Sequence, residues 1–117
     1  MKRGFYFIGT NQEDNKGNSF FGPTLQEGSY QYYGKLFIHR AIDYKSNPQK
    51  WKVSHVESGA NIIACIDLQS ARLIVKKLQP FSLWDIKTYE ALYKAIKQDS
   101  AYEKEVEQIT AIRYMRA

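Results

Sequence analysis

The sequence predicts an α+β fold: a three- to four-stranded antiparallel sheet carries one packed helix, and a C-terminal helical pair follows. Three observations favour this fold class: three strand-forming runs separated by turn signals, one amphipathic helical stripe directly after them, and two helix-start patterns further along the chain. The strands form a β-meander over about residues 35–66, because short connections make sequential strands antiparallel neighbours. We expect residues 1–117 to form a single domain, which is long enough to bury a core without disulfides or metals.

The N-terminal third is the least regular part of the sequence. Residues 5–8 are apolar and aromatic and predict a strand that ends at Gly9, whereas residues 10–19 are polar and predict an exposed loop. Five aromatic residues beside turn formers come next. They are Phe20, Phe21, Tyr30, Tyr32 and Tyr33. Two interpretations stay open: these rings cover the open edge or face of the sheet, or they stack on the bases of a nucleic acid.

Turn signals divide the central region into three strands. Residues 35–44 are rich in aromatic and β-branched side chains, and the Asn and Pro of residues 46–49 predict a turn after them. Residues 51–57 alternate between two faces, which is typical of a strand. Gly59-Ala60 fits a two-residue hairpin turn, since Gly accepts a positive φ at little cost. Residues 61–66 then form a mostly apolar third strand.

The segment after the third strand predicts a helix that packs on the sheet. Asp67 is a suitable N-cap, because its carboxylate can accept hydrogen bonds from the free amides of the first turn. An apolar stripe at helical spacing follows, and Gln79-Pro80 ends the helix. The stripe consists of Ala71, Ile74, Val75 and Leu78.

The C-terminal third predicts two further helices. Ser82 and Asp85 have the spacing of a capping box, which places the start of one helix there. Ser100 and Glu103 repeat that spacing, so another helix is expected from residue 101 onward. Residues 109–116 are also β-branched and aromatic enough for a strand, and continuity with the capped start favours a helix. Homodimerisation through these helices is an open alternative to packing within the chain.

The surplus positive charge is confined to the middle of the chain. Residues 35–80 contain eight basic and three acidic residues and so carry the entire formal net charge of +5, while the flanking segments are neutral. A local basic region can attract an anionic partner, whereas evenly spread charge mainly aids solubility. The candidate contact residues for nucleic acid or an acidic partner are Arg40, Lys45, Lys50, Lys52, Arg72, Lys76 and Lys77. The possible aromatic contacts are Tyr30, Tyr32 and Tyr33.

No recognisable catalytic pattern accompanies this charge. Nucleophile elbows and phosphate-cradling glycine loops are absent, so no catalytic residue, cofactor or enzymatic activity is predicted, and none of these is excluded. His39, His55 and Cys65 lie on three successive predicted strands. A two-residue Gly59-Ala60 turn, however, pairs residue 55 with residue 64 and turns Cys65 to the opposite face. No metal site is therefore expected, although a one-residue slip in the register would restore one.

Composition favours a particular cellular compartment for this chain. A single cysteine cannot build a disulfide framework, which favours a reducing compartment such as the cytoplasm. No apolar run approaches the roughly 20 residues of a membrane span. We therefore expect a soluble cytoplasmic protein without a membrane partner.

Two function classes fit these observations. The first is a non-catalytic binding module that engages nucleic acid through a basic sheet and helix surface. The second is a small protein-binding adaptor or inhibitor that docks on an acidic surface of a nucleic-acid-handling protein. The hairpin of residues 51–59 is similar to hairpins in small proteins of phages and mobile elements, although this similarity implies no function.

Overall fold

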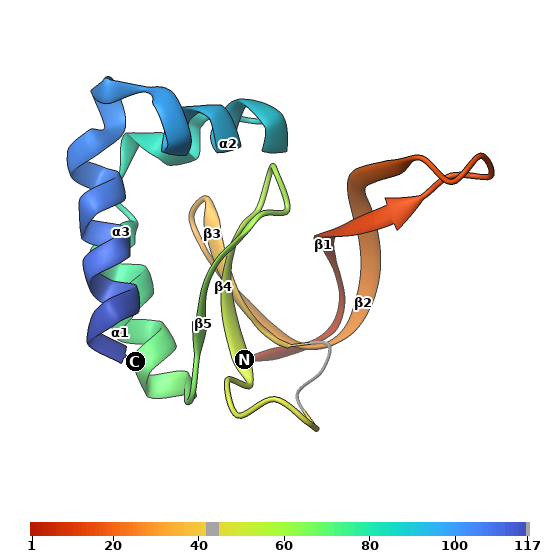
Figure 1. The fold of residues 1–117 in the computed structure, drawn as a ribbon. Coiled ribbons are helices and arrows are strands. Elements are labelled where there is room, and N and C mark those ends of the chain that lie inside the picture. Colours follow the sequence, from red (N-terminus) through yellow and green to blue (C-terminus); the bar gives the residue numbers. More distant parts are fainter. Residues whose placement is uncertain (42–44, 117) are drawn as a thin grey trace.

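The computed structural model describes residues 1–41 and 45–116. Its sheet is an antiparallel meander of five strands in sequence order, followed by three helices and two short 3-10 helices (Figure 1). The strands are β1 (Lys2–Glu13), β2 (Ser19–Tyr33), β3 (Leu36–Arg40), β4 (Trp51–His55) and β5 (Asn61–Cys65). The helices are α1 (Leu68–Leu78), η1 (Ser82–Asp85), α2 (Tyr89–Gln98), η2 (Ser100–Tyr102) and α3 (Glu103–Arg116). The predicted α+β class and the central meander are confirmed, and the sheet continues for two more strands toward the N-terminus.

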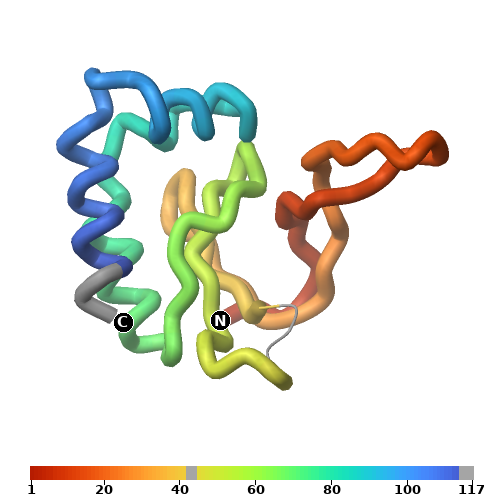
Figure 2. Tube along the Cα trace, in the orientation of Figure 1, coloured from red at the N-terminus to blue at the C-terminus, as the bar shows by residue number. Residues whose placement is uncertain are grey.

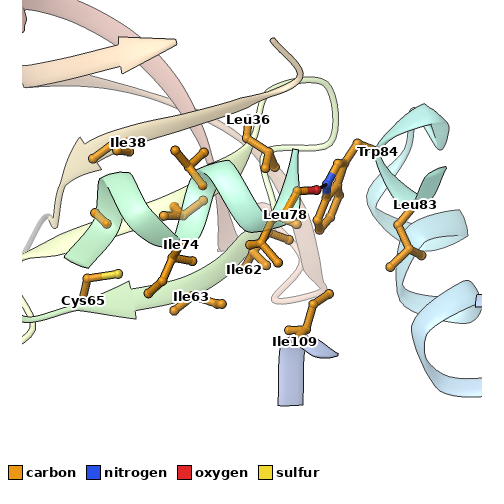
Figure 3. Packing of buried hydrophobic residues seen from close by; sticks show 14 of the residues in the cluster. Leu36, Ile38, Ile62, Ile63, Cys65, Ile74, Leu78, Leu83, Trp84 and Ile109 are labelled. Carbon is orange, nitrogen blue, oxygen red and sulfur yellow. Dashed lines mark hydrogen bonds between the residues drawn. The ribbon is translucent and has the colours of Figure 1, made fainter. Parts of the chain in front are cut away.

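Helix α1 packs on β3, β4 and β5, as predicted. Asp67 caps it by accepting from Ser70 N (2.7 Å), and all four residues of the predicted stripe are buried. They pack in one core with the sheet side chains that face α1, such as Leu36, Ile38 and Ile63 (Figure 3). Trp84 closes one end of this core by donating its indole N–H to the Leu78 carbonyl (2.6 Å). Among the described helices, none combines the length and apolarity that crossing a lipid bilayer requires.

The first two strands form a long ribbon, which corrects the predicted loop over residues 10–19. The loop is only the turn at residues 14–18, because residues 10–13 and 19 belong to β1 and β2. Asp14 holds this turn by accepting from the backbone amides of Lys16 (2.8 Å) and Asn18 (2.9 Å), and Gly17 adopts a φ of 81°. Local hydrogen bonding therefore shortens the polar segment to a tight turn, and the ribbon extends away from the helices (Figure 2).

The sheet curls until its first strand meets the turn between β4 and β5. Gly9 N donates to the Gly59 carbonyl (2.9 Å), although β1 and β5 are opposite edges of the sheet. Inside the curl, Tyr6, Ile8 and Phe37 form a second, smaller core, and Tyr6 Oη donates to the Arg40 carbonyl (3.2 Å). The sheet therefore has an inner side, part of which this core fills, and an outer side that α1 partly covers.

The turn between β4 and β5 differs from the predicted two-residue hairpin. It spans residues 56–60, and Gly59 adopts a φ of 74°. His55 explains the longer turn: its Nδ1 lies 2.7 Å from Ser58 Oγ, and its Nε2 donates to the Trp84 carbonyl (2.8 Å). The turn residues thus satisfy a buried imidazole. A β-bulge between Val53 and Ser54 then shifts the register of the pairing with β5 by one residue, which the predicted hairpin did not include.

The C-terminal helical pair is confirmed, but its first helix starts later than predicted. Ser82 and Asp85 form only the short η1, and α2 begins at Tyr89 with Thr88 as its N-cap. Glu105 accounts for the difference, because its carboxylate accepts from Ser82 N, Ser82 Oγ and Leu83 N and so caps η1 from another helix. Residues 109–116 are helical, as continuity with the capped start indicated.

Gly9→Ala is expected to lower the free energy of unfolding by about 1–3 kcal/mol. An added Cβ would overlap the Phe21 ring and lie 2.8 Å from the Gly59 carbonyl oxygen. Gly4→Ala on the same strand is the matched control, because its Cβ would meet only the Tyr30 ring at 3.7 Å. Urea unfolding measures both variants, and equal midpoints would contradict the role given to the Gly9–Gly59 contact.

Candidate nucleic-acid interface

The structure divides the predicted basic residues between the two sides of the sheet. Arg40 shares the helix-covered side with Ile38 and stacks its guanidinium over the Trp51 ring at 4.5 Å. Lys52 pairs with His39 across the ladder and therefore lies on the inner side. The exposed residues of α1 point away from the sheet. They are Arg72, Lys76 and Lys77. The single basic surface expected from the sequence is therefore two separate surfaces.

One register row on the inner side brings two lysines to a tyrosine. The row runs across the whole sheet and consists of Lys2, Tyr30, His39, Lys52 and Ala64. Three strand spacings separate its two lysines, which is at most about 14 Å between their Cα atoms. No carboxylate belongs to this row or to the adjoining row of Tyr32, Phe37, Ser54 and Asn61.

Lys50 extends this cationic side by one residue. It directly precedes β4, and its carbonyl accepts from Ala41 N (2.9 Å), so the β3–β4 ladder continues through it. Strand alternation then places Lys50 on the side of Lys52. We refer to Lys2, Tyr30, Tyr32, Lys50 and Lys52 as the basic tyrosine face. Lys45 is exposed in the loop before β4, and the ladder assigns it to neither side.

The predicted aromatic contacts differ in their surroundings. Tyr32 is 51% exposed, and its ring lies 5.5 Å from the half-buried ring of Tyr30. Tyr30 in turn packs against the buried Tyr6 at 5.3 Å. Tyr33 faces the other side and packs against the main core. Two of the three tyrosines therefore share the inner side with the lysines, and Tyr33 does not.

A buried polar chain lies directly beneath this face. Ser54 Oγ is 2.7 Å from both His39 Nε2 and Asn61 Oδ1, and His39 Nδ1 is 3.0 Å from the Arg40 carbonyl. Ser54 Oγ donates to Asn61 Oδ1, and His39 Nδ1 donates to the Arg40 carbonyl, so the chain links β3, β4 and β5. Sequence reasoning missed this pairing, because it considered Ser54 only beside His55.

Burial lowers the pKa of His39 from 6.5 to about 4, and the positive charge of Lys52 adds to this effect. The hydrogen bond to the Arg40 carbonyl opposes it. Burial likewise lowers the pKa of His55, against its hydrogen bond to Trp84. Both imidazoles are therefore neutral near pH 7, and the surplus charge of the face comes from its lysines.

The predicted side of Cys65 was wrong, because a β-bulge between Val53 and Ser54 shifts the register by one residue. Cys65 pairs with Trp51 and so shares the helix-covered side with His55, about 13 Å away along the strand. His39, in contrast, lies on the inner side. Within the described part of the chain, no three His, Cys, Asp or Glu side chains are arranged to hold a metal ion.

An apolar patch on the outer side of the ribbon was not predicted. Phe5 and Phe7 alternate along β1 and are 63% and 61% exposed, and Leu25 lies directly across from Phe7. We call these three residues the phenylalanine patch. The sequence signal was ambiguous, because residues 5–8 are apolar at every position and give no indication of which side faces solvent.

Charges around the phenylalanine patch are mixed. Arg3 follows the same side of β1, and Glu27 lies directly across from Phe5. Two exposed rings beside a cation can stack on bases, but the neighbouring carboxylate repels phosphate. An apolar patch with mixed charge at its border is more typical of a protein contact.

Comparisons with known proteins give no family for this chain. No protein-family model, curated protein or solved structure matches it. Its function is therefore argued from its own residues.

The lowered pKa of His39 predicts that acid lowers the stability of the fold. Its folded pKa of about 4 is below the 6.5 of the unfolded chain, so stability is complete above pH 6.5 and is lost as the pH falls toward 4. The pKa difference corresponds to about 3 kcal/mol. Urea unfolding at pH 7 and pH 4.5 should show a smaller acid-induced loss for His39→Gln than for the unchanged protein. The same loss in both would contradict the buried neutral imidazole.

Proposed function

We propose that the chain is a non-catalytic module that binds single-stranded nucleic acid through the basic tyrosine face. The observation that carries this proposal is the register row in which Lys2 and Lys52 flank Tyr30 without a carboxylate. Lysines neutralise phosphates without regard to sequence, and a half-exposed tyrosine such as Tyr32 offers a ring on which any base can stack.

The three cations of α1 have a secondary role in this proposal. Arg72, Lys76 and Lys77 are exposed on the far side of the sheet, where they raise the overall positive potential and are assigned no direct contact with the bound strand. The proposal therefore separates residues that contact phosphate from residues that only attract it.

The salt dependence of binding tests this division. For single strands, log K falls with log salt by about 0.7 for each neutralised phosphate. Lys50→Ala/Lys52→Ala should therefore reduce the slope by about 1.4 for an oligothymidine of about 16 nucleotides. Lys76→Ala/Lys77→Ala removes the same charge from α1 and should leave the slope nearly unchanged. Fluorescence anisotropy at several salt concentrations measures both.

Equal slopes for the two double variants would contradict a localised interface. Unchanged affinity after the Lys50 and Lys52 substitutions would show that these lysines are only solvated and do not contact phosphate. Thermal unfolding provides the folding control, because neither double variant removes a fully buried side chain.

A second candidate function is a protein-binding adaptor or inhibitor. The phenylalanine patch favours it, because two large rings exposed by more than half are costly unless a partner covers them. The partner would be a protein surface with an apolar centre and charges of both signs around it, in contrast to the acidic surface expected from the sequence. Homodimerisation through α2 and α3 stays a prediction.

Phe5→Ser/Phe7→Ser distinguishes this second candidate. If a protein partner covers the patch, the variant should lose a complex that survives nuclease treatment, while oligothymidine binding stays unchanged. Leu73→Ser is the control, since Leu73 is also an exposed apolar residue but lies on α1. Retention of the complex by the double variant would exclude the patch as the docking site.

A further inference from the structure

A pocket on the outer side of the β1–β2 ribbon lies directly beside the phenylalanine patch. It has a volume of about 310 Å³ and lies where the ribbon, the turn between β4 and β5, and the start of α2 meet (Figure 1). Phe7 belongs to the patch and also lines this ribbon pocket, so the two features are continuous. A cavity of roughly 150 Å³ can hold a benzene ring. The ribbon pocket is therefore large enough for one aromatic side chain.

The walls of the ribbon pocket are mainly apolar. Phe21 stacks on Tyr89 with 3.7 Å between ring centroids, and this pair fixes one wall, while Pro23 lines another part. The rim has one charge of each sign, because the exposed residues Glu57 and Lys87 also line the pocket. Such a pocket suits a large apolar side chain that has charges of both signs beside it.

The register of the ribbon places such a side chain on this same surface. Three successive rows on the outer side pair Phe5 with Glu27, Phe7 with Leu25, and Gly9 with Pro23. The last of these rows lines the pocket, whereas the first carries the exposed ring of Phe5. A two-fold axis along the middle row exchanges the other two rows. A second copy turned about this axis would therefore place each Phe5 over the ribbon pocket of the other copy.

The two rim charges lie on different sides of the pocket. Lys87 is on the β2 side, because the neighbouring Tyr89 stacks on Phe21 of β2. Glu57 is on the β1 side, because its turn contacts Gly9 of β1 through the Gly59 carbonyl. The rim therefore presents a carboxylate along one strand of the ribbon and an ammonium group along the other.

The charges beside Phe5 are complementary to those of the rim. The axis keeps each strand over its counterpart, so Glu27 of β2 would face Lys87 of the other copy. Arg3 of β1 would face Glu57 in the same way. None of these four side chains has an ion-pair partner within the residues that the structure describes. A second copy therefore offers each of them the opposite charge that the single chain lacks.

We propose that the phenylalanine patch binds a second copy of this chain, with Phe5 of each copy inserted into the ribbon pocket of the other. Phe7 and Leu25 of both copies form the apolar centre of the contact. The inference rests on the second candidate function, whose partner it names. It uses no residue of the basic tyrosine face, so dimerisation and nucleic-acid binding are independent of each other.

Sedimentation velocity of the full chain at increasing protein concentration tests the inference. We expect a monomer–dimer equilibrium, which Phe5→Ser should weaken about thirtyfold for each of the two pockets. Phe20→Ser is the matched control and should leave the dimer unchanged, because Phe20 is an exposed phenylalanine on the inner side of the same ribbon. A chain that stays monomeric, or a dimer that Phe5→Ser does not weaken, would overturn the inference.

An exchange of charges between copies tests the arrangement of the contact. Glu27→Lys and Lys87→Glu each bring like charges together at both pockets and should weaken the dimer about tenfold. In an equimolar mixture, a heterodimer of the two variants has opposite charges at both pockets, so the affinity should return. Lys94→Glu is the control, because it lies on α2 outside the pocket and should not restore binding when mixed with Glu27→Lys.

A mixture of Glu27→Lys and Lys87→Glu that associates as weakly as its components would overturn the inference. Oligothymidine binding keeps this outcome separate from the proposed function. Phe5→Ser should bind oligothymidine as the unchanged protein does, as measured by fluorescence anisotropy, since its substitution lies on the outer side. Dimerisation that fails while oligothymidine still binds would count against the second copy alone.

Discussion

The close approach of Gly9 and Gly59 determines the shape of this protein. A flat sheet of five strands would leave both faces of the β1–β2 ribbon in water. The hydrogen bond between Gly9 N and the Gly59 carbonyl, at 2.9 Å, instead joins opposite edges of the sheet and encloses Tyr6, Ile8 and Phe37. Neither glycine tolerates a side chain there, since a Cβ on Gly59 would lie 2.6 Å from Gly9 N. The curl separates the inner cations from those of α1.

Two buried histidines connect this curl to the rest of the fold. His55 joins the β4–β5 turn to η1 through Ser58 and the Trp84 carbonyl, and this turn carries Gly59. His39 joins β3 to β4 through Ser54 beneath the basic tyrosine face. Buried polar groups of this kind are stable only when every donor and acceptor has a partner. Both imidazoles therefore stabilise the fold, and the proposed nucleic-acid contacts lie on the surface above His39.

The sequence predicts those parts of the fold and the site whose signals lie in neighbouring residues, and it fails where distant contacts decide. The α1 cap at Asp67 and its apolar stripe are local, and they were predicted correctly. The ribbon was not, because its Gly and Pro residues resemble a loop. Pro23 is tolerated in β2 because that part of the strand pairs only with β1, so its missing N–H interrupts no second ladder. The pairing of Lys52 with Ala64 and the side occupied by Cys65 depend on the β-bulge between Val53 and Ser54, which no local pattern signals. The inner row was therefore beyond prediction, although its lysine and tyrosine members were mostly among the candidates.

The central claim is that a single strand of nucleic acid contacts the inner side of the curl and not α1. Backbone amide shift mapping during titration with oligothymidine tests it most directly. The account predicts that the largest shifts fall at Lys2, Tyr30, Tyr32 and Lys52, while Arg72, Lys76 and Lys77 stay nearly unchanged. Shifts concentrated on α1, or spread evenly over all exposed lysines, would contradict it.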